Sequence, residues 1–351
     1  MKIAVLLPNH NHGRFIGRAV AAIQRQSHAD WEMAIVDDAS TDDSREAIAE
    51  LARQDRRIVT TFRSERGGAV AALQTGYAMT TAPLVLGAAA DDCIGNDRFF
   101  EAANAAFEAN PRAGCVFAKA ALVDGETGER YFVMAMARSS GWNPPQQCMR
   151  DFLCGKLWIH GAAAVWRRSA VDRVGGYDAA LGPRADYFLN HALAALDGAV
   201  FLDEVATDVR HSQGSYGQSS DGESFFREYA LVERNLMRLD LGYRVRTRWR
   251  RKWRGNVINE RLAHRWQGQF FDSIRGPLAA FDPWHRTRFQ DDLGEIAMRL
   301  HVHAQDWERE LARRVAAAES IFDDIAGTLQ RDRIDALVHW WKRRRSVGAS
   351  R

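Results

Sequence analysis

Short apolar runs alternate with amphipathic segments along the first hundred residues. The apolar runs predict strands at 3–7, 31–36, 58–62 and 83–88. Apolar positions at helical spacing predict helices at 14–26, from a cap at Ser40 or Thr41 to about 53, and from Gly67-Gly68 to about 79. Because strand and helix alternate with short turns, we expect an α/β domain with a mostly parallel sheet covered on both faces. Ligands of such sheets bind beyond the carboxyl ends of the strands.

The pattern loosens after Pro111. A hairpin is predicted from 115–123 and 130–134, a loop at 139–147, and a strand at 159–166 followed by a helix from Ser169. From residue 225 onward the pattern is almost wholly helical. We therefore expect an α-helical C-terminal region after the α/β domain.

Composition narrows the class of protein. The 351 residues are 46% hydrophobic, which is enough for a buried core and excludes a disordered chain. No apolar stretch approaches the roughly 20 residues that cross a bilayer, and the first residues are strand-like, without a secretory signal. We therefore expect a cytoplasmic protein, in which the four cysteines, which show no CxxC spacing, are reduced thiols.

Three acidic positions follow predicted strands or lie in a later loop. They are Asp37-Asp38, Asp91-Asp92 and Asp186. Carboxylates at the carboxyl edge of a sheet hold a cation such as Mg²⁺ or Mn²⁺, or accept hydrogen bonds from a base and ribose. The alternative is that each aspartate only caps the helix that follows it.

Several motifs occur together in the order typical of one enzyme family. The segment 36–42 reads VDDASTD, 5–11 reads VLLPNHN, and Gly67-Gly68, 74–76 (QTG) and 89–92 (AADD) follow. Later come 175–178 (GGYD), Asp186, and Arg210 with His211 and Ser215. Over residues 1 to about 220 the chain thus resembles the family 2 glycosyltransferases of the GT-A (Rossmann-like) fold.

The resemblance implies a site for a nucleotide-sugar donor. The residues placed in the donor site are Pro8, His10, Asn11, Asp37, Asp38 and Asp92. His10 stands where the family usually has an aromatic residue that stacks on the base. Asp91 would contact a divalent cation, Mg²⁺ or Mn²⁺, with His211 completing the metal shell. Arg66, just before Gly67, is a candidate phosphate contact, or else a solvated surface arginine.

The implied reaction is displacement at the anomeric carbon with inversion, for which an acceptor hydroxyl needs a general base. Asp186 is the candidate base.

Two positions depart from the family pattern, because Ala89 and Ala185 replace acids. The alternative function is therefore a catalytically impaired binding or scaffold protein. A dinucleotide-dependent oxidoreductase is excluded, because the turn at 8–13 (PNHNHG) lacks the required glycine pattern.

The expected domains are a nucleotide-sugar-binding half at 1–110, an acceptor-binding half at 111–224 and a basic helical region at 225–351. Residues 1–224 carry 22 basic and 28 acidic side chains, whereas residues 225–351 carry 26 and 17. The segments 243–254 and 340–345 combine arginines with tryptophans, which suits an anionic membrane surface. The alternatives are a solvated basic face, a homo-oligomer contact or, least favoured, a nucleic acid.

We expect a glycan or lipid-linked acceptor and a role in surface polysaccharide or lipopolysaccharide synthesis.

Overall fold

The computed structural model describes residues 1–124, 128–134, 137, 139–153, 157–211, 222–239 and 241. The chain divides into two units, residues 1–219 and 220–351. In the second unit the described part is essentially one helix, α8 (Gly222–Arg238), in the region where the sequence predicted helix from residue 225 onward. The expected basic segments 243–254 and 340–345 lie outside the described residues. No helix in the described part of the chain is long and apolar enough to span a membrane.

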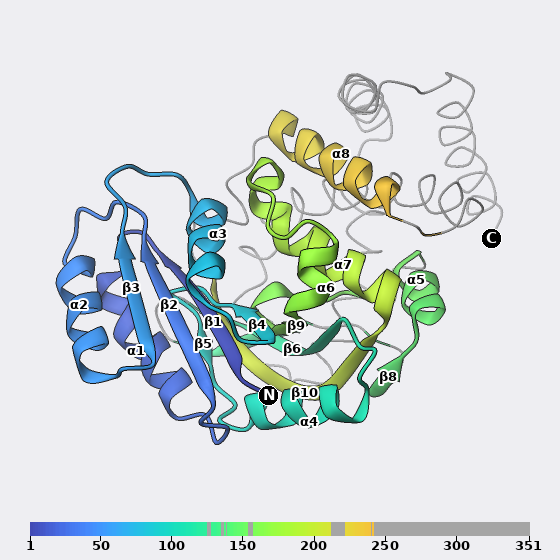
Figure 1. Cartoon of the computed structure of the whole chain (residues 1–351), viewed down its shortest axis with the longest axis horizontal. Coiled ribbons are helices and arrows are strands. Elements are labelled where there is room, and N and C mark those ends of the chain that lie inside the picture. Colours follow the sequence, from blue (N-terminus) through green and yellow to red (C-terminus); the bar gives the residue numbers. More distant parts are fainter. Residues whose placement is uncertain are drawn as a thin grey trace, which may run out of the picture. The chain divides into compact units, whose positions relative to one another are not determined.

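A ten-stranded sheet organises the first unit (Figure 1). Its strands are β1 (Ile3–Asn9), β2 (Trp31–Asp37), β3 (Ile58–Phe62), β4 (Leu84–Gly87), β5 (Cys93–Ile94), β6 (Cys115–Asp124), β7 (Arg130–Met134), β8 (Gly141–Asn143), β9 (Ala164–Arg167) and β10 (Ala199–His211). The order is β3-β2-β1-β4-β9-β6-β10-β5, with β7 on β6 and β8 on β10. β3, β2, β1, β4, β6 and β10 run in one direction, and β9 runs against its neighbours β4 and β6.

Seven helices of the first unit are described. They are α1 (Gly13–Gln24), α2 (Ser44–Gln54), α3 (Ala69–Met79), α4 (Phe99–Ala109), α5 (Pro145–Leu153), α6 (Arg168–Arg173) and α7 (Ala185–Asp197). Two short 3₁₀ helices, η1 (Gly161–Ala163) and η2 (Ala179–Arg184), precede β9 and α7. The mostly parallel α/β sheet predicted from the sequence is thereby confirmed.

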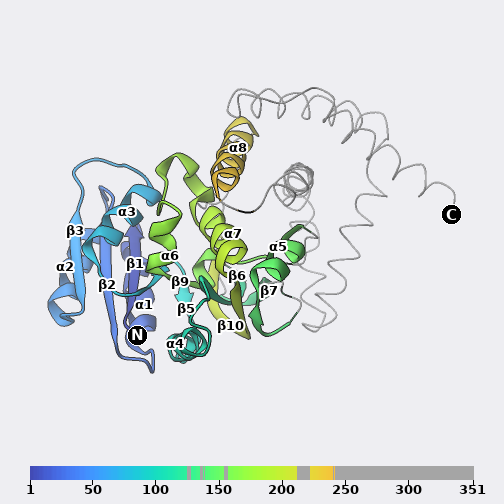
Figure 2. The same cartoon turned by 45° about the vertical axis from the view of Figure 1, so that its right-hand side comes forward.

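Alternate residues of the central strands face two different layers. Ile3, Val5 and Leu7 of β1 belong to the core that contains the apolar faces of α1, α2 and α4. On the opposite face, Leu6 lies close to Gly76 of α3. The layer on that face consists of α3, α6 and α7, as two views show (Figure 1; Figure 2). Because both faces are covered, the strands are apolar throughout, as the sequence pattern indicated.

The carboxyl ends of β1, β2 and β4 lie side by side, because the register pairs Asn9 with Asp37 and Leu6 with Gly87. β9 is antiparallel to β4, with Leu86 opposite Val165. The segment just before β9, which includes η1, therefore lies at the same edge as the loop after β4. This edge carries the candidate site.

Some predicted elements are wrong. Ser40 and Thr41 do not cap α2, which begins at Ser44; the Ser44 N–H is instead accepted by Asp42 Oδ1 at 3.1 Å. The predicted loop at 139–147 contains β8 and the start of α5, and the predicted strand at 159–166 begins only at Ala164. Strand pairing with β10 explains β8, since Ala199 lies opposite Asn143. The hairpin of β6 and β7 is confirmed.

Candidate active site

Asp37, at the end of β2, is fully buried and bonded to the protein itself. Its Oδ1 accepts from Asn9 Nδ2 at 3.0 Å, and its Oδ2 accepts from the Ser40 N–H at 3.1 Å. Arg45 Nε lies 3.4 Å from Oδ2. This carboxylate therefore joins the ends of β1 and β2 to the turn that leads into α2. In that arrangement its oxygens are occupied by protein donors.

Asp38 is bonded in a similar way to the loop before α3. Its two carboxylate oxygens accept from the N–H groups of Gly67 and Gly68, at 2.8 and 2.7 Å. Arg63 Nε lies 3.2 Å from Oδ1, and the Asp38 side chain is only 3% exposed. Gly68 has a φ of 87°, a conformation that favours glycine. Asp38 thus holds the glycine turn in place against the end of β2.

The loop after β1 presents His10 and Asn11 above this network. His10 Nδ1 lies 2.8 Å from the Asp38 carbonyl oxygen, which fixes the orientation of the half-buried ring. Asn11 adopts a φ of 55°, and its Oδ1 accepts from the Thr41 N–H at 2.7 Å. Pro8 lies in β1, opposite Val36 of β2. The sheet therefore brings these predicted donor residues together at one edge.

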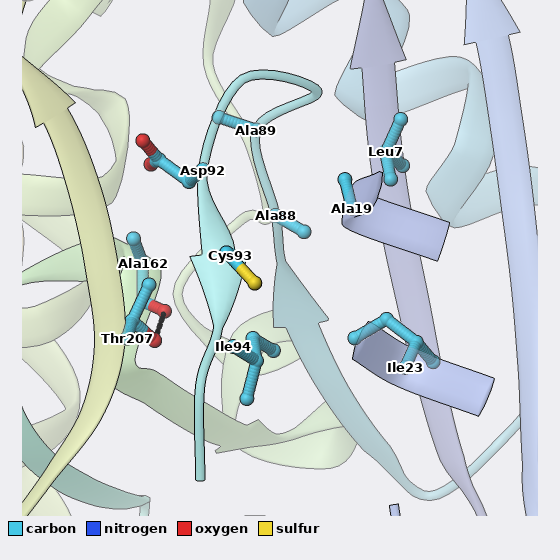
Figure 3. A pocket seen from close by; sticks show the side chains of 10 residues that line it. All are labelled: Leu7, Ala19, Ile23, Ala88, Ala89, Asp92, Cys93, Ile94, Ala162 and Thr207. Atoms are coloured by element: carbon cyan, nitrogen blue, oxygen red, sulfur yellow. Dashed lines mark hydrogen bonds between the residues drawn. The ribbon is translucent and has the colours of Figure 1, made fainter. Parts of the chain in front are cut away.

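The loop after β4 carries the pair Asp91 and Asp92. Asp92 Oδ1 accepts from the Arg210 N–H at 2.9 Å, which ties this loop to β10. Burial, together with the nearby Asp91 charge, raises the pKa of Asp92 to about 8. Asp92 borders a small, mostly apolar pocket, whose other lining residues are Leu7, Ala19, Ile23, Ala88, Ala89, Cys93, Ile94, Ala162 and Thr207 (Figure 3). Its carboxylate is thus costly to ionise, whereas Asp91 makes no hydrogen bond within the described residues.

The acids near this loop do not form a complete metal centre. Asp208 of β10 also raises the pKa of Asp92, but it is bound by Arg130, with Nε 2.6 Å from Oδ1. Among the described side chains, no three His, Cys, Asp or Glu residues are grouped so as to hold a metal ion. The His211 backbone ends β10 opposite Asp124, and its side chain lies outside the description. Asp91 is therefore the one described acid of the predicted metal shell.

Asp186 lies in the first turn of α7 and contacts the segment before β9. Its Oδ1 accepts from the Tyr187 N–H at 2.7 Å. Its Oδ2 lies so close to Gly161 that a Cβ at that position would come within 2.1 Å of it. Burial raises the pKa of Asp186, while the charges of His160 and Arg184 lower it. A raised pKa makes the Asp186 carboxylate a stronger base than an ordinary aspartate.

Arg66 is exposed in the loop between β3 and α3 and forms no hydrogen bond within the described residues. Its predicted phosphate contact stays a prediction. By contrast, His160 was missed by the sequence reasoning although it interacts electrostatically with Asp186. The signal was weak, because His160 is a single histidine in an apolar stretch, and only the fold brings it to Asp186.

Comparisons with known proteins relate the chain to a family of enzymes. The sequence profile of glycosyl transferase family 2 matches residues 4–175. Over 93 residues the chain is 39% identical to an uncharacterized glycosyltransferase of Nostoc sp. strain PCC 7120, which covers 26% of this chain. The aligned segments cover 29%, 28% and 31% of the length of three such relatives.

Solved structures share the fold at low sequence identity. S. aureus TarS 1-349 in complex with UDP-GlcNAc aligns with a TM-score of 0.61 at 15% identity, covering 93% of this chain and 90% of that chain. Mannosyltransferase PcManGT from Pyrobaculum calidifontis, in complex with GDP-Man and Mn²⁺, aligns with a TM-score of 0.55 at 18% identity, covering 92% and 87%. Together with the family match, this shows that residues 4–175 belong to glycosyl transferase family 2, within a domain of the GT-A fold.

Proposed function

We propose that this protein transfers a sugar from a nucleoside-diphosphate sugar to an acceptor hydroxyl, with inversion at the anomeric carbon. The observation that carries the proposal is the placement of Asp186. Its partly buried carboxylate lies against Gly161, at the same edge of the sheet as the loop that carries Asp91. One edge thus offers a carboxylate that can accept the proton of the acceptor hydroxyl and a second carboxylate that is free to bind a cation. The proposed reaction needs both.

The donor would bind over the loops after β1 and β2. His10 would stack on the base, with its ring oriented by the Asp38 carbonyl oxygen. Because Asp37 and Asp38 are bonded to Ser40 and to the Gly67-Gly68 turn, we assign them to shaping the base and ribose pocket. Pro8 and Asn11 would line this pocket, Asp92 would lie beneath the donor, and Arg66 would reach a phosphate.

Asp91 fits a divalent cation that also binds the donor. Mg²⁺ is commonly held by one or two carboxylates together with substrate phosphates, so a single free acid is a suitable protein ligand. When bound, Mg²⁺ or Mn²⁺ would neutralise the charge that develops on the departing nucleoside diphosphate. His211 is the second proposed ligand. The solved structure of PcManGT is a complex with GDP-Man and Mn²⁺, which supports a metal in this fold.

The chemistry proposed for the chain itself is proton transfer. The acceptor O–H bond breaks as its oxygen forms a bond to the anomeric carbon, and the proton passes to Asp186. The bond from that carbon to the diphosphate breaks on the opposite face, which gives inversion. A general base of this kind contributes about 10²- to 10⁴-fold in rate. The pKa of Asp186, raised by burial, favours acceptance of the proton.

A panel of nucleotide sugars tests this function. Calorimetry with Mn²⁺ should identify a donor that binds, and release of nucleoside diphosphate should follow when an acceptor or water is present. Asp91→Asn should weaken metal-dependent binding of the nucleoside diphosphate about tenfold or more, because it removes the free acid. Asp43→Asn, an exposed acid at the start of α2, is the matched control. Equal binding by wild type and Asp91→Asn would remove Asp91 from the site.

A second candidate function is that of a binding or scaffold protein. Ala89 and Ala185 replace acids of the family pattern, and the described residues contain no complete metal group. The donor panel separates the two functions, because a scaffold would bind donor without releasing nucleoside diphosphate at any metal concentration.

Acceptor and partners belong to the proposal as well. We propose a glycan or lipid-linked acceptor in surface polysaccharide synthesis, with peripheral contact of the basic residues 243–254 to an anionic membrane or to a second copy of the chain. Each exposed basic residue near an anionic surface contributes about 1 kcal/mol, an attraction that salt screens. Flotation with anionic and neutral vesicles at two salt concentrations distinguishes membrane contact from oligomerisation.

A further inference from the structure

The Asp186 carboxylate lies directly against the backbone of η1. A Cβ at Gly161 would come within 2.1 Å of Asp186 Oδ2, so only glycine leaves room for the carboxylate. Asp186 Oδ1 accepts a hydrogen bond from the Tyr187 N–H at 2.7 Å. Oδ2 receives no hydrogen bond from another residue in the described part of the chain, so it is the oxygen left to accept a proton. The position of η1 therefore sets the position of this oxygen.

Two buried polar side chains fix the segment that contains η1. Asn190 of α7 donates from Nδ2 to the Ile159 carbonyl oxygen at 3.0 Å. Thr207 of β10 donates from Oγ1 to the Ala162 carbonyl oxygen at 2.8 Å (Figure 3). Thr207 is only 1% exposed, so its hydroxyl is shielded from water and is committed to this bond. The segment is thus attached to α7 before η1 and to β10 within η1.

β10 also holds the loop that follows β4. Thr207 lies opposite Ile94 of β5, and the Arg210 N–H donates to Asp92 Oδ1 at 2.9 Å. The loop that carries Asp91 and the segment that contacts the proposed base are therefore both attached to β10 between residues 207 and 210. Displacement with inversion places the base and the departing diphosphate on opposite faces of the sugar, so their relative position must be fixed.

We propose that Thr207 is a positioning residue for the transferase reaction, whose hydroxyl holds η1 where Gly161 places the Asp186 carboxylate for the acceptor proton. This inference rests on the proposed function of Asp186. Thr207 keeps its own proton in the bond to Ala162, and the acceptor proton passes to Asp186. Without the hydroxyl the Ala162 carbonyl loses its donor, and η1 is free to shift against α7. A displacement of about 1 Å in a reacting group costs about 10²-fold in rate.

Two substitutions of Thr207 separate its hydrogen bond from its packing. Thr207→Val keeps the shape of the side chain and removes the hydroxyl, whereas Thr207→Ser keeps the hydroxyl and removes a methyl group. Single-turnover transfer by Thr207→Val should fall about tenfold or more with unchanged donor affinity, and Thr207→Ser should stay within about threefold of wild type. A greater loss in Thr207→Ser than in Thr207→Val would show a packing role and overturn the inference.

Thr80→Val is the matched control for loss of stability. Thr80 is 5% exposed, and its Oγ1 donates to the Gly76 carbonyl oxygen at 3.1 Å and accepts from Arg168 at 2.8 Å. It lies just before β4, at the end of the strand opposite to the candidate site. Thr80→Val should therefore lower the free energy of unfolding at least as much as Thr207→Val, measured with urea, yet leave transfer within about threefold of wild type. Equal losses of turnover in the two variants would contradict the proposal.

Gly161→Ala tests the same arrangement from the side of the backbone. The added Cβ would displace the Asp186 carboxylate, so transfer should fall at least as far as in Thr207→Val, again with unchanged donor affinity. Turnover of Gly161→Ala at the wild-type rate would overturn the inference.

Asp186→Asn, measured in the same assay, distinguishes this inference from the proposed function. If Asp186→Asn loses turnover and Thr207→Val does not, the positioning role fails and the proposed base stands. If Asp186→Asn keeps full turnover, the proposed base fails, and the role of Thr207 fails with it.

Discussion

Carboxylates in the first sixty residues lie in the opposite electrostatic environment to the carboxylates of Asp92 and Asp186, which come later in the chain. Backbone and side-chain donors, working against partial burial, lower the pKa of Glu32 and Asp42, and the Arg57 hydrogen bond lowers the pKa of Asp55 to about 2. At the edge, burial raises the pKa of Asp92 to about 8 and also raises that of Asp186. In the first group, hydrogen bonds from the protein stabilise the charged carboxylate. In the second group, burial disfavours the charged carboxylate, and a bound substrate or cation would stabilise it.

The difference separates acids that stabilise the fold from acids that are available for chemistry. Asp37 and Asp38 belong to the first kind by geometry, since protein donors contact both oxygens of each carboxylate. Asp91 and Asp186 keep capacity for a ligand. The comparison predicts that substitutions in the two regions have effects of different sign and kind.

The largest expected effect is that of Asp37→Ala on stability. The substitution leaves the buried Asn9 amide and the Ser40 N–H without their acceptor, which costs about 2–4 kcal/mol in free energy of unfolding. Urea denaturation measures this cost. Asp43→Ala, at an exposed position of the same turn, should change stability by no more than about 0.5 kcal/mol. Equal costs for the two variants would contradict the structural role of Asp37.

Asp92→Asn should have the opposite effect to Asp37→Ala and increase the free energy of unfolding at high pH. In the unfolded chain the pKa of an aspartate is about 3.9, but in the fold the pKa of Asp92 is about 8. Its contribution to stability is thus fully present below about pH 4 and is lost as pH rises through 8. An asparagine avoids this loss, so the variant should gain at least about 1 kcal/mol over wild type at pH 9 and little at pH 4. Denaturation at both pH values checks the sign, and a variant less stable than wild type at pH 9 would refute the account.

The smallest expected effect is that of Asp55→Asn. The depressed pKa of Asp55 means that its contribution is present above about pH 4 and is lost as pH falls toward 2. Because Arg57 is 38% exposed, we expect only about 0.5–1 kcal/mol. Asp55→Asn should therefore destabilise the protein at pH 6 and not at pH 2.5. A gain in stability at pH 6 would remove the contrast between the two regions.

Sequence reasoning predicted the parts of the site that depend on local pattern. The acids after β2 and β4 lie at the sheet edge because strand and turn residues are adjacent in the chain, and Gly68 starts α3 as expected. The internal bonds of Asp38 to Gly67 and Gly68 connect residues about thirty positions apart, so no local pattern reveals them.

Other features were missed for related reasons. The cap of α2 was placed at Ser40 or Thr41, but Ser40 Oγ accepts from the Asn11 N–H across the fold. The N-cap residue is Asp43, and Asp42 Oδ1 accepts from the Ser44 N–H at the start of the helix. His160 interacts electrostatically with Asp186 only because β9 runs antiparallel to β4 and α7 packs against η1. Pairing of β10 with β6 along its whole length also joins distant segments, which periodicity alone does not show.

Turnover and donor affinity of Asp186→Asn, measured together, test the central claim most directly. If Asp186 is the base, the variant should bind the nucleotide sugar as tightly as wild type by calorimetry, because a residue that takes the acceptor's proton need not bind the donor's base or phosphates. Single-turnover transfer to the acceptor should fall about 100-fold or more, since the proton then has no carboxylate to accept it. A variant that transfers sugar at the wild-type rate, or that loses donor affinity in proportion to its rate, would contradict the account.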